Sequence, residues 1–197
     1  MNRASYCLFE TSLGLCGIAW TKNGESSSSP AISFFQLPEA AKELTQMRLD
    51  RVCGAGDPAV PPALIAHVIE RVRLHLLGSP QDIRDVPIDL KEIGPFARQV
   101  YEAARNIPAG ETRTYGEIAK ALNQPNAAQA VGQALGRNPI PLIIPCHRVL
   151  AAGGKPGGFS APGGTTTKVR LLALEGVALE PSATAKLQRT LWKTTRP

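Results

Sequence analysis

The 197-residue sequence predicts an α+β protein in which a small α/β part precedes a mostly helical part. Two observations indicate this fold class. Short runs of apolar and aromatic residues typical of strands lie near the start, and apolar residues at helical spacing fill most later segments. A break near residues 80–94 separates the two parts. We therefore expect domains at residues 1–88 and 94–180, followed by a basic tail at 181–197.

Three strands are predicted in the first part. They cover residues 6–9, 17–20 and 32–35. Turns rich in Ser and Gly separate them, including the serine run at 26–29, because these residues favour the tight backbone conformations of turns.

Two helices, at residues 39–48 and 62–77, complete the first part. The second helix has an apolar stripe that is expected to face the core, formed by Leu64, Ile65, Val68, Ile69, Val72 and Leu76. His67 and His75 lie on the same helix. Because no cysteine stands at helical spacing from them, we interpret both as surface or core residues and not as metal ligands.

The second part begins at Gly94-Pro95, where a helix stop precedes a favoured first helical residue. Apolar residues then recur at helical spacing over 96–107. Thr114 and Glu117 have the form of a capping box, which predicts a second helix. A third is expected to start at Asn126. The second and third helices have the outline of a helix-turn-helix, with a simple packed hairpin as the alternative.

A last apolar helix is predicted at residues 169–174, with Gly176 as its cap. Glu175 lies in its last turn, where the helix dipole disfavours a carboxylate. A residue placed against this local preference indicates a tertiary partner, although an exposed surface glutamate is the alternative.

Composition indicates an intracellular protein with an anionic partner. Lys and Arg number 22 against 16 Asp and Glu, which gives a net charge of +6 and suits nucleic acid, although solvated surface lysines are the alternative. Four cysteines without paired spacing favour a reducing compartment. The start does not have the form of a signal peptide, and no apolar run is long enough to span a membrane. We expect a cytoplasmic protein with no membrane partner.

The most informative string is PCHRV at 145–149, which follows the apolar run 140–144. It joins the thiol of Cys146 to the imidazole of His147 and the cation of Arg148. A thiol in this setting is a candidate nucleophile, because a nearby base or positive charge increases the population of the reactive thiolate. A buried cysteine that serves only in packing is the alternative.

The surrounding motifs resemble those of the O6-alkylguanine-DNA alkyltransferases, also called methylated-DNA--protein-cysteine methyltransferases. They are found in that family's order over well over a third of the chain: FARQV at 96–100, TYGEIA at 114–119, AVG at 130–132, RNP at 137–139, IPCHRV at 144–149, GFS at 158–160 and LLALEG at 171–176.

This resemblance implies a ribonuclease-H-like first domain without chemistry of its own, and a second domain that binds the minor groove of double-stranded DNA. An alkylated guanine would be flipped into a pocket, where the Cys146 thiolate takes the alkyl group from O6, or from O4 of an alkylated thymine. The thioether is not readily reversed, so the protein is consumed. The resemblance implies a monomer whose transfer step needs no metal and no organic cofactor. Some members of the family hold a structural zinc in the first domain, but this sequence has no match to their ligand positions.

The resemblance also implies a role for individual residues. Glu175 orients His147, which draws the proton from Cys146 through a water, while Tyr115 protonates the departing guanine and Asn138 braces the loop. Arg148 is expected to stabilise the fold. Phe159 is expected to pack on the extruded base, the Ser160 backbone to donate to its O6, and backbone groups near Cys146 and Val149 to bind the remaining guanine edges. The DNA-binding set is expected to be Thr114, Ala127, Ala128, Gln129, Ala130 and Gly132.

Gln129 departs from the family pattern, which has an arginine that fills the space left by the flipped base. Glutamine is shorter and uncharged, so we expect weaker flipping or assistance from Arg137. Gln129 could instead complete a helix cap after Asn126. Three other functions therefore stay open: a module that binds alkylated DNA and recruits repair, a relative that acts on a small alkylated substrate, and a thiol acyltransferase or protease using Cys146 and His147.

Overall fold

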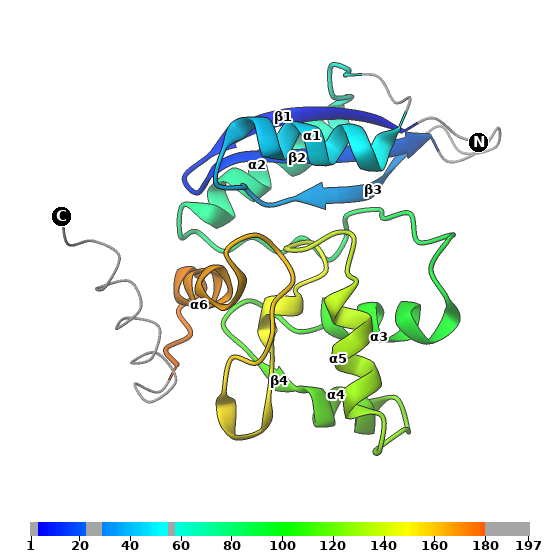
Figure 1. Cartoon of the computed structure of the whole chain (residues 1–197), viewed down its shortest axis with the longest axis vertical. Helices are drawn as coiled ribbons and strands as arrows, with labels where there is room; N and C mark the ends of the chain where they lie inside the picture. Colours follow the sequence, from blue (N-terminus) through cyan, green and yellow to red (C-terminus); the bar gives the residue numbers. More distant parts are fainter. Residues whose placement is uncertain (1–3, 23–28, 55–57, 180–197) are drawn as a thin grey trace.

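A computed structural model describes residues 4–22, 29–54 and 58–179. It has a sheet layer above a mostly helical layer (Figure 1). The predicted serine turn at 26–29 lies mostly outside the described residues, and the predicted tail at 181–197 lies entirely outside them.

The three predicted strands form one antiparallel sheet in the order β1-β2-β3. Their bounds are β1 Ser5–Thr11, β2 Gly14–Lys22 and β3 Pro30–Gln36. Each strand is longer than its apolar run, because backbone pairing extends beyond the residues whose side chains are buried.

The two helices that follow cover opposite faces of this sheet (Figure 1). Alternate side chains of a strand point to opposite faces. Tyr6 and Ala19 therefore pack with Leu49 of α1 (Lys42–Cys53), whereas Ile18 joins the main core together with Val72 of α2 (Ala63–Leu76).

The bounds of α1 differ from the predicted 39–48 at both ends. Glu39 stays outside the helix, since its backbone N–H donates to Thr45 Oγ1 and its carboxylate accepts from Gln36. The helix ends at Gly54, which has a positive φ of 58°. The prediction for α2 is confirmed within one residue at each end, although Leu64 of its stripe is exposed.

The helical layer contains α3 (Pro95–Arg105), α4 (Tyr115–Ala121), α5 (Ala128–Gly136) and α6 (Gly164–Leu174). The capping box that begins α4 is confirmed, because Thr114 Oγ1 accepts from the Glu117 N–H and the Glu117 carboxylate accepts from the Thr114 N–H. Helix α5 begins two residues after Asn126, which therefore does not cap it.

Helix α6 begins five residues earlier than the predicted 169–174. Its first turn contains three threonines, which have low helix propensity and gave no apolar period. The pair β4 (Arg113–Thr114) and β5 (Val149–Leu150) is parallel and was not predicted, because a two-residue strand has no period to detect.

One continuous cluster of buried side chains joins the two layers. It includes Val72 of α2, Tyr101 of α3 and Ile144 of the loop after α5. Backbone hydrogen bonds add to this connection: the N–H of Phe35 in β3 donates to the carbonyl of Pro139 over 3.0 Å. The layers therefore share a core. Within the described ranges, no helix is both long and apolar enough to cross a membrane.

Candidate active site

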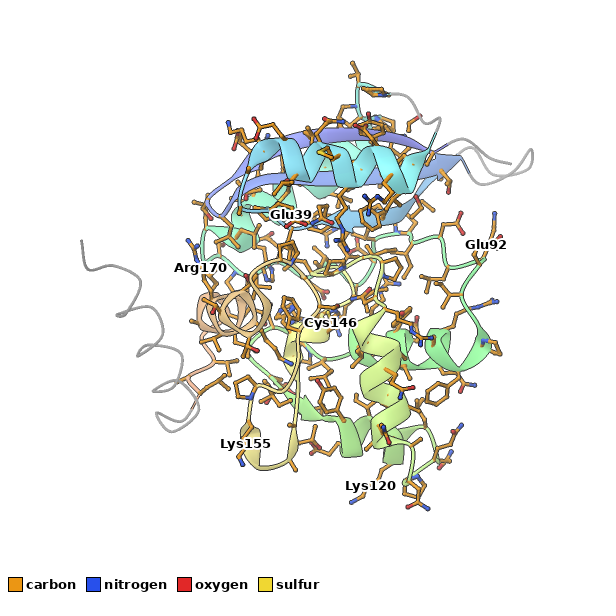
Figure 2. The ribbon with its side chains drawn as sticks, viewed as in Figure 1. Glu39, Glu92, Lys120, Cys146, Lys155 and Arg170 are labelled. Carbon is orange, nitrogen blue, oxygen red and sulfur yellow. The ribbon has the colours of Figure 1, made fainter. Side chains whose placement is uncertain are left out.

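Cys146 lies near the middle of the molecule, between the sheet layer and α5 (Figure 2). It is the first residue of a 3₁₀ turn, η1 (Cys146–Arg148), held by a hydrogen bond from the Arg148 N–H to the Pro145 carbonyl. Three residues complete one turn of such a helix, so consecutive side chains point in different directions. Cys146 lines a pocket, whereas His147 and Arg148 both contact Glu175 on the other side.

Cys146 is 6 % exposed, and its sulfur is contacted by Asn138. The amide Nδ2 of Asn138 lies 3.2 Å from the sulfur and 2.8 Å from the Ile144 carbonyl, to which it donates. Its Oδ1 accepts from the Ile140 N–H at 2.9 Å. The structure thus brings Asn138 to the nucleophile, with its position fixed by the backbone on both sides.

Burial raises the pKa of the Cys146 thiol, and the Asn138 hydrogen bond and the Lys168 charge oppose this only in part. The resting sulfur is therefore a neutral thiol at pH 7, and the site needs a base to make a thiolate.

Glu175 is the centre of a buried polar cluster. Its Oε1 accepts from His147 Nε2 at 2.9 Å and from Arg148 Nη2 at 2.8 Å, and its Oε2 accepts from Arg148 Nε at 2.9 Å. A further donor to Oε1 is Nε2 of His75, at 2.8 Å. Burial alone would raise the pKa of this carboxyl, but the hydrogen bonds from these three side chains outweigh it and lower the pKa well below its usual range. Glu175 is therefore ionised.

The predicted pairing of Glu175 with His147 is thus present in the structure. Burial lowers the pKa of His147 and outweighs the opposing effect of Glu175, so the imidazole is neutral near pH 7. Its proton lies on Nε2, which donates to the carboxylate. Nδ1 then carries a lone pair, and it is buried without a hydrogen-bond partner among the described residues. It is the atom available to accept a proton.

A pocket of about 560 Å³ opens beside the sulfur. Its walls come from α4, α5 and the loop before α6, and its lining residues are Tyr115, Ala128, Gln129, Gly132, Gln133, Leu135, Gly136, Cys146, Gly158, Phe159 and Ser160. Of the predicted substrate and DNA residues, Phe159, Ser160, Ala128, Gln129 and Gly132 belong to this set.

The other predicted substrate and DNA residues lie elsewhere. Thr114 caps α4, Ala127 caps α5 and Ala130 lies in the first turn of α5. Val149 is fully buried, and its carbonyl accepts from Lys168. The Val149 carbonyl, one of the backbone groups expected near the base, is therefore already paired with Lys168.

The ring of Tyr115 forms one wall of the pocket and is held on both sides by glycines. A Cβ on Gly132 would lie 3.8 Å from the ring, and a Cβ on Gly157 would lie only 3.1 Å from the phenol oxygen. Gly157 also has a φ of +67°, so both its conformation and its contact with Tyr115 require glycine. Burial raises the pKa of Tyr115, so its hydroxyl keeps its proton.

Lys168 on α6 was not identified from the sequence. It is fully buried, and its Nζ donates to the Val149 carbonyl at 2.5 Å and lies 5.9 Å from the centre of the Tyr115 ring. Burial lowers its pKa to about 8, and its charge favours the thiolate of Cys146. The only signal of its burial in the sequence was its position on a helix face shared with apolar residues.

Gln129 is exposed at the second position of α5 and has no capping hydrogen bond, so the structural role as a cap is wrong. The suggested helper, Arg137, follows the opposite end of this helix and lines a separate groove with Phe34 and Arg48. Gln133, one turn after Gln129, lines the pocket together with Gln129, whereas Arg137 does not.

The sequence is similar to that of proteins from one family. Residues 95–177 match the family model described as 6-O-methylguanine DNA methyltransferase, DNA binding domain. The methylated-DNA--protein-cysteine methyltransferase of Mycolicibacterium paratuberculosis is 44 % identical over 114 residues, which is 58 % of this chain and 67 % of that protein. The protein of the same name from Methanosarcina acetivorans is 53 % identical over 81 residues, 41 % of this chain and 51 % of that one.

The similarity extends to the whole fold. The crystal structure of Mycobacterium tuberculosis OGT in complex with DNA matches with a TM-score of 0.66 at 31 % identity, covering 87 % of this chain and 92 % of that one. A crystal structure of O6-methylguanine-DNA methyltransferase from Pyrococcus kodakaraensis matches with a TM-score of 0.64 at 27 % identity, covering 88 % and 99 % of the two chains.

Proposed function

The chain belongs to the family of methylated-DNA--protein-cysteine methyltransferases, and we propose that it repairs DNA by accepting an alkyl group from O6-alkylguanine on Cys146. The observation that carries this proposal is the geometry around the sulfur. A neutral thiol opens into a pocket, and a neutral imidazole held by an ionised carboxylate lies behind it.

The reaction begins with the proton of Cys146. Glu175 keeps the His147 proton on Nε2, so Nδ1 takes the proton from the sulfur through one bridging water. The carboxylate also stabilises the imidazolium that forms, as the third member of a hydrolase triad does. Asn138 Nδ2 and the Lys168 charge stabilise the thiolate.

The thiolate then displaces guanine from the alkyl carbon. The sulfur–carbon bond forms as the carbon–oxygen bond breaks, and the electron pair leaves with the base. The base takes a proton from the Tyr115 hydroxyl, which is later reprotonated from solvent. Because the cysteine thiolate is a poor leaving group from the carbon of a thioether, the product is stable and each molecule acts once.

DNA reaches the site through α4 and α5, which pack together and which we interpret as a helix-turn-helix. Ala127, Ala128 and Ala130 give α5 a smooth surface for the minor groove, and its pocket-lining side receives the flipped base. The net charge of +6 supports binding to the phosphate backbone. In the same scheme residues 1–88 form a ribonuclease-H-like domain, and the protein acts as a cytoplasmic monomer.

Intact-mass measurement tests this function. After incubation with duplex DNA containing one O6-methylguanine, the protein should gain one methyl group, and peptide mapping should locate it on Cys146. The other three cysteines are internal controls, since burial raises their pKa to about 11 for Cys7 and Cys53 and about 12 for Cys16.

The competing functions give different results. Binding to the alkylated duplex without a mass change would indicate a recruitment module. Methylation by free O6-methylguanine but not by the duplex would indicate a small-molecule substrate. A thiol protease or acyltransferase would gain no methyl group from either.

Replacing Gln129 by arginine should speed repair of duplex DNA about fivefold. A longer, cationic side chain fills the space that the flipped base leaves in the duplex, which adds roughly 1 kcal/mol of interaction with the DNA. Transfer from free O6-benzylguanine needs no flipping and should stay unchanged. Gln124→Arg is the matched control, as it adds the same charge in the exposed turn before α5, outside the pocket. Equal acceleration on both substrates would contradict a role of Gln129 in flipping.

The transfer rate should be nearly constant from pH 8 to 6.5 and fall at lower pH. Burial keeps the pKa of His147 below its ordinary value of 6.5, and only the neutral imidazole accepts the proton. His147 has a higher pKa in the unfolded chain than in the folded protein, so on acidification the unfolded chain is protonated at a higher pH. The free energy of unfolding should therefore also fall below pH 6.5. Single-turnover rates with free O6-benzylguanine measure the profile. A rate rising about tenfold per pH unit through pH 8 would instead indicate attack by free thiolate.

A further inference from the structure

His75 comes from α2, in the layer that holds the sheet, yet its side chain reaches the polar cluster behind Cys146. It is fully buried, and its Nε2 lies 2.8 Å from Glu175 Oε1. This is the same oxygen that accepts from His147 Nε2 at 2.9 Å. His75 lies outside the matched region 95–177 and therefore outside the motifs that identified the site.

The hydrogen bonds of His75 fix its tautomer. The backbone N–H of Gln81 donates to His75 Nδ1 at 3.1 Å, so Nδ1 carries a lone pair. The proton must then lie on Nε2, where it points at the carboxylate. His75 is thus a neutral donor to Glu175, held from behind by the backbone that follows α2.

Two histidines around one carboxylate might suggest a metal site, but their geometry opposes it. Both Nε2 atoms are at direct hydrogen-bond distance from Oε1, and Arg148 donates to both carboxylate oxygens. A cation would have to displace the guanidinium and both protons. Within the part of the chain that the structure describes, no group of three His, Cys, Asp or Glu side chains is arranged to hold a metal ion.

We propose that His75 is a positioning residue for alkyl transfer, which holds Glu175 Oε1 in line with His147 and shares its negative charge. The proposal rests on the proposed function. Its physical basis is that Oε1 accepts hydrogen bonds from two imidazoles. Without the hydrogen bond from His75, the carboxylate can rotate away from His147. The negative charge on Oε1 is then no longer shared between the two imidazoles.

Two effects should follow when His75 stops donating. Transfer slows, because the Nδ1 lone pair of His147 is less well directed. The acid limb of the pH profile moves to higher pH, because an unshared carboxylate favours the protonated form of His147. The charged and titratable groups facing His75 are Glu175 at the end of α6 and His147 and Arg148 in η1.

A pair of variants separates positioning from simple packing. In His75→Asn the side-chain oxygen takes the place of Nδ1 and keeps the bond from Gln81, but the side chain is too short to reach Glu175. In His75→Gln the amide nitrogen takes the place of Nε2 and restores the donor. The exposed His67 of the same helix gives the control variant His67→Asn.

The full chain is tested with two reagents. Single-turnover transfer from O6-benzylguanine and alkylation of Cys146 by iodoacetamide are both followed by intact mass between pH 5 and 9, with denaturant unfolding measured for each variant. We expect His75→Asn to react roughly tenfold more slowly with both reagents and to have its acid limb at higher pH. His75→Gln and His67→Asn should follow the wild type.

An unchanged acid limb and rate in His75→Asn would overturn the proposal, even if that variant were less stable. The proposal would also be overturned if His75→Gln folds but does not show the wild-type dependence of rate on pH. If the wild type takes no alkyl group from O6-benzylguanine or from DNA, the proposed function fails, and the iodoacetamide profiles still decide whether His75 positions the base.

Discussion

Replacing Glu175 by glutamine is expected to slow alkyl transfer at least about a hundredfold and to lower the free energy of unfolding by about 3–5 kcal/mol. The carboxylate accepts four hydrogen bonds, from His75, His147 and twice from Arg148. A glutamine has one acceptor oxygen and no charge. It would leave the buried guanidinium of Arg148 without its counter-ion and would no longer favour the imidazolium of His147.

Single-turnover transfer and denaturant unfolding measure the two effects separately. Affinity for undamaged duplex DNA should stay near that of the wild type, because Glu175 does not line the pocket. Glu92→Gln is a matched control, since this exposed glutamate points away from the site (Figure 2). A folded Glu175→Gln protein that transfers at the normal rate would refute the role of the carboxylate in the proton transfer.

Replacing Asn138 by alanine should slow transfer at least about tenfold and destabilise the fold by about 1–3 kcal/mol. The sulfur loses its side-chain hydrogen bond, so the pKa of Cys146 rises further and the thiolate becomes harder to form. The Ile140 N–H loses its partner as well, and the Ile144 carbonyl keeps only the Cys146 N–H as a donor. Both effects come from one side chain that joins the nucleophile to its supporting loop.

The rate of Cys146 alkylation by iodoacetamide as a function of pH measures the shift in the thiol pKa, and denaturant unfolding measures stability. Asn106→Ala is the control, because Asn106 is exposed at the end of α3. A normal alkylation profile in a destabilised Asn138→Ala protein would limit Asn138 to a structural role.

Most of the fold was predictable where side-chain burial follows a clear period. The three strands were located because short apolar and aromatic runs lie between turn residues, and α2 because its apolar residues form a stripe. Helix α1 was displaced in the prediction because Leu44, Met47 and Val52 are exposed on it, so hydrophobicity does not mark its buried side. The start of α6 was missed because its threonines carry no apolar signal.

The residues of the site were also predictable only in part. Cys146, Asn138, His147 and Glu175 lie in short motifs, so the resemblance located them, and the structure brings them together. His75 and Lys168 are different, because their roles arise only from tertiary packing. A histidine among the buried residues of α2 and a lysine on α6 have no local signature of a site. How the two layers pack decides that His75 reaches Glu175, and how α6 packs within the helical layer decides that Lys168 reaches the Val149 carbonyl.

The bond between His75 and Glu175 joins residues 100 positions apart, which bears on when the protein becomes reactive. Contacts of such long range form late in folding, because the intervening chain must first be ordered. During synthesis the thiol of Cys146 is made before the carboxylate of Glu175. A nascent chain therefore has a nucleophile whose base is incomplete. The complete set of hydrogen bonds behind Cys146 therefore exists only after the two layers have packed together.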